Sequence, residues 1–246
     1  MNITQDNWIF LVYSKETFFS KSKKINIDGH RFSSKTSLDE LFKFYKTDKS
    51  SEHHNFVKYY NYHLKNFKNK KIDFLEIGSA TGASASSFVK FFNKSQAFCV
   101  DVNLTLVKFI SSKINYFGID CSNLKSLKKF QSQVEIKYQV KKYDFIIDDG
   151  SHILSDQLKS LNFFYNYLKK NGFYIIEDYK FANYFARCND VNHFTIEDLI
   201  NKIKFNRNIK SNILDVNLIN QIKKSKIYNY KGKSKISDIV FIKKTT

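Results

Sequence analysis

The stretch from Tyr143 to Asp178 decides the fold. It reads YDFIIDDGSH (143–152), continues over 154–169 with the apolar spacing of a helix, and ends in NGFYIIED (171–178). Each apolar run is typical of a buried strand, and in an open α/β sheet ligands bind outside the carboxyl ends of such strands. The sequence therefore predicts one shared site, formed by the polar residues at these two strand ends: Asp148, Asp149, His152, Glu177 and Asp178.

A glycine-containing turn follows an earlier apolar strand in DFLEIGSATGASA (73–85). The strand carries Glu76, and Gly78 and Gly82 precede a helix expected from Ser84 to Phe92. Glycines let the backbone pass close to a ligand, and the free N–H groups of the helix start face it. The GxxxG spacing, with the acid before the glycines, favours S-adenosylmethionine over NAD. An ordinary strand-to-helix connection is the alternative.

The next strands supply further acids for such a cofactor. A strand over Ala97–Val100 ends in Asp101, whose two carboxylate oxygens can accept from both hydroxyls of a ribose. A helix is expected over Leu104–Lys113 and a strand over Asn115–Ile119. Asp120 then either accepts from the adenine amine or caps the following helix. Asp148 is expected to face the cofactor or the sheet edge.

Upstream of the glycine turn the pattern is helical. Ser37 is expected to cap a helix, and a second helix is expected over Phe56–Phe67. Between them lies the polar segment YKTDKSSEHH (45–54). It is either a helix–helix turn with exposed histidines or a loop that folds over the active site, because it concentrates Asp48, Lys49, His53 and His54.

The composition indicates one large α/β unit. The chain has 246 residues, of which 42% are hydrophobic. The cysteines, Cys99, Cys121 and Cys188, are scattered and odd in number, which favours a reducing compartment over a disulfide framework or zinc cluster. The N-terminus lacks the pattern of a secretion signal, and no apolar run approaches the roughly 20 residues of a membrane span. We therefore expect a soluble, cytoplasmic protein without a membrane span.

A net charge of +18 is, by itself, typical of proteins that bind nucleic acid or an anionic surface. The charge comes mostly from lysine spread along the whole chain, together with abundant Asn, Ile, Phe and Tyr and no proline. This profile is typical of a compositional bias of the coding genome rather than of a binding patch. It disfavours nucleic acid and favours an anionic small molecule or a glycan donor as the partner.

The remaining segments complete the predicted sheet. Trp8–Tyr13 is expected to form a short strand and Thr195–Asn206 a helix, while Ser225–Tyr230 and Ser237–Lys243 flank Lys231-Gly232-Lys233 as a β-hairpin. The predicted fold is an α/β, Rossmann-like class I methyltransferase fold. It has a mostly parallel seven-stranded sheet with helices on both faces and a C-terminal antiparallel hairpin.

The domain prediction follows from the same pattern. Residues 1–36 are expected to be an N-terminal extension and residues 37–246 a single methyltransferase domain, since no internal repeat or linker argues for a second one. Within it, 37–70 is a helical, lid-like segment and 71–246 is the Rossmann-like core.

Four motifs together resemble a known family. LEIGSATGAS, YDFIIDDGSH with Gln157 soon after, NGFYIIED and the upstream YKTDKSSEHH look like the class I methyltransferases of the macrocin and mycinamicin sugar O-methyltransferase group. The resemblance covers 38–178 and, more loosely, the final hairpin. The family pattern has a glycine after the tyrosine and after the lysine of the upstream motif, where this sequence has Lys46 and Ser50.

The resemblance implies specific roles for the acids and the histidine. In that family the second aspartate of DDGSH and the paired acids after the fifth strand bind magnesium, and the motif histidine is the general base. Carried over, the ligands are Asp149, Glu177 and Asp178, and the base is His152. Magnesium prefers such hard carboxylate oxygens, and an imidazole with a pKa near 6.5 suits proton abstraction from a sugar hydroxyl.

The acceptor implied by the resemblance is a sugar, a nucleotide sugar or a glycan. We expect a bacterial surface polysaccharide such as a capsule, with contacts from Asp48, Lys49, His53 and Tyr179. The aromatic residues from Tyr179 to Phe185 either line the acceptor pocket or bury in a homo-oligomer contact. The alternatives are an RNA methyltransferase, a non-catalytic nucleotide-binding protein, or acids that only cap helices and pair with lysines.

Overall fold

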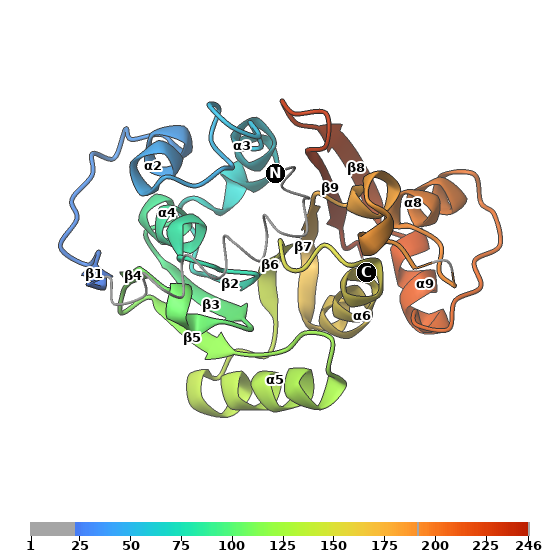
Figure 1. Ribbon diagram of the computed structural model, residues 1–246. Coiled ribbons are helices and arrows are strands. Elements are labelled where there is room, and N and C mark those ends of the chain that lie inside the picture. The colour runs from blue at the N-terminus through green and yellow to red at the C-terminus, as the bar shows by residue number, and fades with distance from the viewer. Residues whose placement is uncertain (1–22, 191, 246) are drawn as a thin grey trace, which may run out of the picture.

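The computed structural model describes residues 23–190 and 192–245 and is organised around a seven-stranded sheet with the order β5-β3-β2-β6-β7-β9-β8 (Figure 1). The first five strands of this order are parallel, and β9 runs antiparallel to both β7 and β8. The predicted fold class is therefore confirmed. The strands are β2 (Ile72–Ile77), β3 (Ser95–Asp101), β5 (Ile114–Gly118), β6 (Tyr143–Asp148), β7 (Leu168–Glu177), β8 (Lys226–Lys231) and β9 (Asp238–Lys243).

Helices cover both faces of the sheet (Figure 1). One face carries α2 (Leu38–Tyr45), α3 (Val57–Leu64) and α4 (Ala83–Phe91). The other carries α5 (Leu124–Tyr138), α6 (Leu154–Phe164), α8 (Ile196–Lys204) and α9 (Val216–Lys223). The short elements are β1 (Ile25–Asn26), β4 (Phe109–Ile110), α7 (Phe181–Tyr184) and the 3-10 turns Lys65–Phe67, Leu104–Leu106, Tyr165–Tyr167 and Ala186–Cys188.

The central strands have almost continuous apolar sequences because both faces of the sheet are buried. In β2, Leu75 packs with the helices of one face and Phe74 with those of the other, as the two-residue period of a strand requires. In β6 the neighbours Ile146 and Phe145 divide in the same way. Truncation of a fully buried side chain such as Phe145 to alanine costs about 3–5 kcal/mol of stability.

Helix α2 begins and ends as its sequence directs. Ser37 and Glu40 form a capping box, in which the Ser37 hydroxyl accepts from the Glu40 N–H and the Glu40 carboxylate accepts from the Ser37 N–H. The helix ends at Lys46, whose φ of 61° lies in the left-handed region. Glycine is the residue that adopts this conformation at least cost.

The expected helix over 104–113 is wrong. The chain forms a 3-10 turn at Leu104–Leu106, capped by the Asn103 side chain, and then extends as β4, which pairs in parallel with β1. The N–H groups of Lys108 and Phe109 both donate to the Thr81 carbonyl, which holds this segment against the glycine turn. Pairing with a distant strand therefore decides its conformation.

Two further expectations about element bounds change. The helix expected over 154–169 ends at Phe164, and β7 already begins at Leu168, with Asn171 at a φ of 64° beside an irregularity in the β6–β7 register. Helix α9 was not predicted from the sequence. The predicted hairpin is present as β8 and β9. The strand expected at Trp8–Tyr13, and most of the 1–36 extension, lie outside the described residues.

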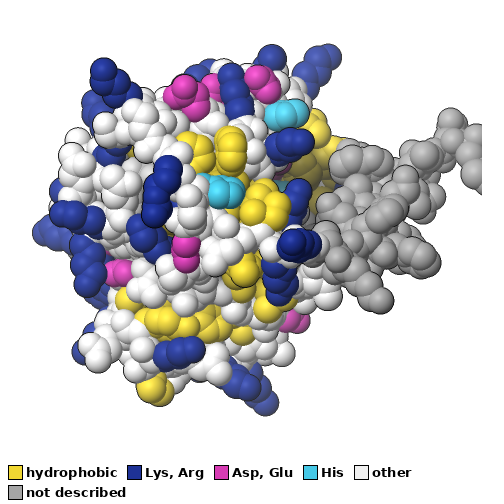
Figure 2. All heavy atoms as spheres, turned by 90° about the vertical axis from the view of Figure 1, so that its left-hand side faces the viewer, with side chains coloured by type: hydrophobic (Ala, Val, Ile, Leu, Met, Phe, Trp, Pro, Cys, Tyr) yellow, Lys and Arg dark blue, Asp and Glu magenta, His cyan; other side chains and the backbone are white. Residues whose placement is uncertain are grey.

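The surface charge is dispersed. On the face shown in Figure 2, lysine and arginine side chains are scattered among acidic, apolar and neutral residues rather than gathered in one patch. Within residues 23–190 and 192–245, no helix is long and apolar enough to cross a membrane.

Candidate active site

The carboxyl ends of the parallel strands border one cavity of about 300 Å³. The glycine turn after β2, the end of β3, the turn after β5 and the loop after β6 all contribute to its wall. Four residues predicted to bind the cofactor line this cavity, namely Gly78, Asp101, Asp120 and Asp148. The same cavity is lined by Asp48, Asp149 and His152, so the predicted cofactor and catalytic regions are continuous.

Gly78 is required by the close approach of two loops. Its φ is 81°, and a Cβ atom at this position would lie 2.1 Å from the carbonyl oxygen of Asp149. No larger residue fits without displacing the loop that carries Asp149. The glycine at this turn therefore determines how closely the loop that carries Asp149 approaches the end of β2.

Asp101 and Asp120 present carboxylates to the cavity wall. The Asp101 oxygens accept from the N–H groups of Ala80 (2.8 Å) and Asn103 (2.9 Å), which fixes the side chain and leaves each oxygen a further lone pair. Asp120 accepts from the Ser122 N–H, and the Ser122 side chain together with this N–H lowers the pKa of the Asp120 carboxyl. Helix α5 is capped by Asn123, so the capping alternative for Asp120 does not apply.

Three other predicted cofactor residues lie outside the cavity lining. Glu76 is 1% exposed, and its burial raises the pKa of the carboxyl to about 7. Gly82 precedes α4 with a φ of 79°, and a Cβ there would clash with the Tyr116 hydroxyl at 2.0 Å. Ser84 is buried in the first turn of α4. These residues shape the turn, and their contact with a cofactor stays a prediction.

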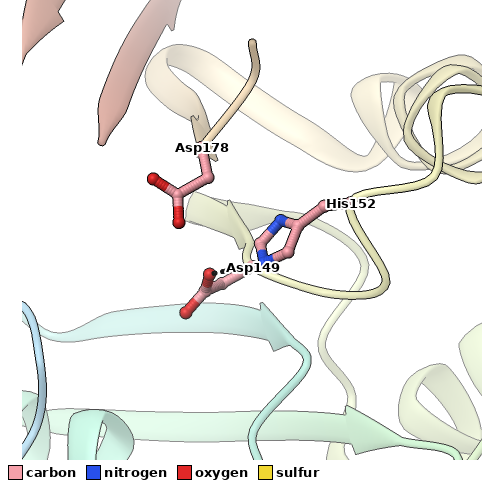
Figure 3. A group of neighbouring side chains, drawn as sticks. All are labelled: Asp149, His152 and Asp178. Atoms are coloured by element: carbon pink, nitrogen blue, oxygen red, sulfur yellow. Dashed lines mark ion pairs between the residues drawn. The ribbon is translucent and has the colours of Figure 1, made fainter. Parts of the chain in front are cut away.

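Asp149, His152 and Asp178 converge at the ends of β6 and β7. Figure 3 shows the Asp178 carboxylate pointing towards that of Asp149, with the His152 ring beside both, and one potential ligand atom from each lies within 4.8 Å of the others. His152 and Asp178 have φ values of 56° and 51°. Left-handed backbone at non-glycine residues costs about 1–3 kcal/mol each and concentrates at functional sites.

The electrostatic environment of this group suits proton transfer and cation binding. Burial lowers the pKa of His152, so its imidazole is neutral at neutral pH. Burial, assisted by the charge of Asp149, raises the pKa of Asp178 to about 8. Asp178 Oδ1 and His152 Nδ1 are buried without a hydrogen-bond partner among the described residues. A buried carboxylate oxygen without a partner favours a bound cation.

Glu177 faces a different set of residues. Its Oε2 accepts from Lys49 Nζ at 2.9 Å, and its Oε1 accepts from the Tyr60 hydroxyl. Lys49 Nζ also donates to Asp149 Oδ2 at 2.5 Å. The assignment of Glu177 as a metal ligand stays a prediction, because the structure brings Glu177 to Lys49 and Tyr60 rather than into the group of Asp149, His152 and Asp178.

The 45–54 loop folds over the site, as the second interpretation predicts. Lys49 is 2% exposed, and Asp48 lines the cavity. His53 is exposed, whereas His54 Nε2 lies 3.8 Å from Asp48 Oδ2. Tyr179, expected to contact the acceptor, is instead buried at 2% exposure in the hydrophobic core. The aromatic ring beside the site is that of Phe181, 4.6 Å from the His152 ring.

The sequence missed Tyr60 and gave no role to Gln157. Tyr60 lies on the apolar face of α3, where an aromatic residue looks like ordinary core, and only the fold reveals its bond to Glu177. Gln157 lines the cavity from α6, and both of its amide atoms are buried without a partner in the described part of the chain.

The sheet order, with a glycine turn after β2, the first strand of this sheet along the chain, is that of the class I methyltransferase fold. The acids and the histidine lie at the carboxyl ends of this sheet. MycE methyltransferase from the mycinamycin biosynthetic pathway, in complex with Mg and SAH, superimposes with a TM-score of 0.66 at 21% identity, covering 86% of this chain and 55% of that chain. Its complex with Mg, SAH and mycinamycin VI gives a TM-score of 0.65 at 23% identity, covering 86% and 54%. At these identities the likeness shows the fold alone.

Curated relatives confirm the predicted resemblance. L-olivosyl-oleandolide 3-O-methyltransferase of Streptomyces antibioticus is 27% identical over 183 residues, 68% of this chain and 45% of that protein. Mycinamicin VI 2''-O-methyltransferase of Micromonospora griseorubida is 26% identical over 157 residues, 59% and 37%. Demethylmacrocin O-methyltransferase of Streptomyces fradiae is 26% identical over 153 residues. The chain thus spans less than half the length of these relatives, and no protein-family model matches it.

Proposed function

We propose that this chain is an S-adenosylmethionine- and Mg²⁺-dependent O-methyltransferase that acts on a sugar hydroxyl. The observation that carries the proposal is the single cavity lined both by the glycine turn and Asp101 and by Asp149 and His152. A methyl donor bound in this cavity would lie next to the group of Asp149, His152 and Asp178, which supports the proposal. The relatives, whose names describe sugar O-methylation of macrolides, support the acceptor class.

The residues present fit a hard divalent cation. Asp149 and Asp178 offer carboxylate oxygens within one group, and Asp178 Oδ1, which has no partner in the part of the chain that the structure describes, is available to a cation. Magnesium is commonly bound through one or two carboxylates with its remaining positions left to water and substrate. When bound, Mg²⁺ supplies positive charge that makes a neighbouring acceptor hydroxyl more acidic.

The chain's own residues perform the remaining steps. The cavity wall holds the donor so that its methyl carbon lies in line with the acceptor oxygen, and this positioning supplies much of the rate. The neutral His152 imidazole takes the hydroxyl proton as the oxygen–methyl bond forms and the sulfur–methyl bond breaks. The Asp149 carboxylate, with Oδ1 at 3.8 Å from His152 Nε2, stabilises the imidazolium that results.

The test is methyl transfer from labelled S-adenosylmethionine to a panel of acceptors, with and without a chelator. The panel contains macrolide glycosides, nucleotide sugars and a bacterial surface polysaccharide. The polysaccharide is the acceptor expected from the sequence, and it has no support among the relatives, so it is compared directly with the macrolide glycosides. We expect His152→Ala to lower the rate by about 10² to 10⁴-fold while SAH binding persists. Lys58→Ala, at an exposed position outside the cavity lining, is the control and keeps full activity. Transfer that resists both the chelator and His152→Ala would refute the mechanism.

A further inference from the structure

A second cavity, of about 390 Å³, lies at the opposite end of the sheet from the candidate active site. Its lining includes loop residues that precede parallel strands: Lys68 and Asn69 lie before β2, Asn93 before β3 and Lys113 before β5. The active-site cavity borders the carboxyl ends of these strands, and among the described residues the two cavities share no lining residue. A ligand in the second cavity would therefore not compete with the cofactor.

The lysine and arginine side chains that line this cavity have no acidic partner. They are Arg31, Lys68, Lys90 and Lys113. No acidic residue of the described chain lines the cavity, and none of the four forms an ion pair within residues 23–190 and 192–245. Asp28, which lines an adjoining cavity, accepts from Ser111 and Ser112 instead. The cavity therefore has a local excess of positive charge.

Neutral groups hold three of these cations in place. Lys90 Nζ donates to the His30 carbonyl oxygen at 3.0 Å. Lys113 Nζ donates to the Asn93 carbonyl oxygen at 2.7 Å, and a backbone carbonyl accepts from Arg31 Nη1 at 3.0 Å. A backbone carbonyl positions a cation without cancelling its charge. An ammonium group has three donors and a guanidinium group five, so each cation keeps donors for a ligand.

The cations also lie close enough together to affect one another. Burial lowers the pKa of Lys90, and the charges of Lys113 and Arg31 lower it further. The charge of Asp28 acts in the opposite direction. Like charges that are held together repel, and an anion bound between them offsets this repulsion. The arrangement therefore favours a bound anion.

Apolar side chains complete the lining of the cavity. Phe32, Leu41, Val89 and Phe91 contribute to it, and Phe32 packs edge-on against Phe44 with 5.1 Å between the ring centroids. The volume lies within the range of small-molecule sites, which combine apolar contacts with a few polar groups. Lysine and arginine are common partners of phosphate oxygens. Size, charge and apolar lining together fit a phosphorylated organic molecule better than a bare inorganic ion.

We propose that this cavity binds a small organic diphosphate, such as a nucleoside diphosphate. Arg31, Lys90 and Lys113 donate to the phosphate oxygens. Phe32 packs against the organic part. This binding site goes beyond the proposed methyl transfer and does not depend on it. Helix α4 begins at the glycine turn and ends beside the second cavity, so the two sites lie at the two ends of one helix.

The test is calorimetric titration of uridine diphosphate into the whole chain, with SAH present to occupy the cofactor cavity, at about 0.15 M salt. Lys90→Gln/Lys113→Gln is expected to weaken binding by about tenfold or more, because it removes two charge-assisted hydrogen bonds. Lys128→Gln/Lys129→Gln removes the same charge from exposed positions of α5. This pair is the matched control, and its dissociation constant should stay within about twofold of the wild type.

Pyrophosphate tests the organic part of the ligand. Phe32→Ala is expected to weaken the binding of uridine diphosphate by about fivefold or more and to leave pyrophosphate binding unchanged, because only apolar contact is lost. SAH binding should persist in every variant, which shows that each of them is folded.

Each possible failure has a distinct meaning. Equal losses in the lysine pair and its control would show that the net charge of the protein attracts the anion, and would overturn the site. Binding of uridine diphosphate too weak to detect at millimolar concentration would overturn it as well. Equal binding of uridine diphosphate and pyrophosphate, with no effect of Phe32→Ala, would refute an organic ligand. None of these outcomes bears on methyl transfer, which has its own test.

Discussion

Two neighbouring acids of the candidate site, Glu177 and Asp178, differ in their hydrogen-bond partners. Glu177 and Asp178 are adjacent in sequence, yet one carboxylate is bound by Lys49 and Tyr60 while the other has an oxygen without a partner among the described residues. The sequence identified both as site residues, because acids at a strand end are visible in a linear pattern. It could not distinguish their partners, because Lys49 lies 128 residues before Glu177 and reaches it only in the folded chain.

Glu76 predicts a pH dependence of stability. Its carboxyl has a pKa of about 7 in the folded protein, raised by burial from 4.5, so the folded state binds more protons than the unfolded state between these values. The free energy of unfolding should therefore fall as the pH rises from about 4.5 to about 7, by an amount on the order of 3 kcal/mol. Urea unfolding at pH 5 and pH 8 measures it.

The control isolates the Glu76 contribution from other groups that titrate. Glu76→Gln should lose this part of the slope, whereas Glu52→Gln, at an exposed position, should keep the wild-type slope. Identical slopes in the wild type and Glu76→Gln would show that the buried carboxyl keeps its ordinary pKa.

Lys46 predicts a gain in stability. It ends α2 with a φ of 61°, a conformation that costs a lysine about 1 kcal/mol and a glycine little. Lys46→Gly should therefore raise the free energy of unfolding by about 1 kcal/mol in urea titrations. Lys58→Gly, within α3, should lower it by about 1 kcal/mol. A loss of stability in Lys46→Gly would mean that the lysine side chain contributes more than its backbone conformation costs.

Elements divide into those that the sequence predicts and those that it does not. Strands β6 and β7 could be predicted because parallel strands buried on both faces give long apolar runs, and α2 could be predicted from its cap. Strand β4 could not, because its two residues depend on pairing with β1. Helix α9 was not predicted, although its buried Leu218, Ile219 and Ile222 recur at helical spacing, because it is only eight residues long and lies between lysine- and asparagine-rich segments.

At the scale of the whole molecule, we propose that residues 37–246 form one domain. Helices α2 and α3, expected as a lid-like segment, contribute Phe42 and Tyr60 to the same core cluster as Phe74 and Phe145 of the sheet. These helices are thus a layer of the body. The loop between them reaches the candidate active site with Asp48 and Lys49, and α3 reaches Glu177 with the Tyr60 hydroxyl. The sequence could not show this, because an amphipathic helix looks alike on a lid and on a sheet.

Ligand binding should stabilise the whole chain. At one hundred times its dissociation constant, SAH is expected to raise the free energy of unfolding by about 2.7 kcal/mol, because only the folded state has the cavity. Thermal unfolding with increasing SAH measures the effect, and NAD at the same concentration should give none. Asp101→Asn should reduce the shift, since that carboxylate lines the cavity. Equal stabilisation by NAD would contradict the cofactor assignment.

The contact between the β8–β9 turn and the 45–54 loop also has a consequence for synthesis of the protein. The Lys233 N–H and Gly232 hold His54 from a point about 180 residues later in the chain. A nascent chain that has emerged only as far as β7 already contains Lys49, Asp149 and Asp178, but it lacks the hairpin that fixes the loop. The hairpin must therefore leave the ribosome before Lys49 is secured beside the carboxylates, so the 45–54 loop should take its final place later than the strands that carry Asp149 and Asp178.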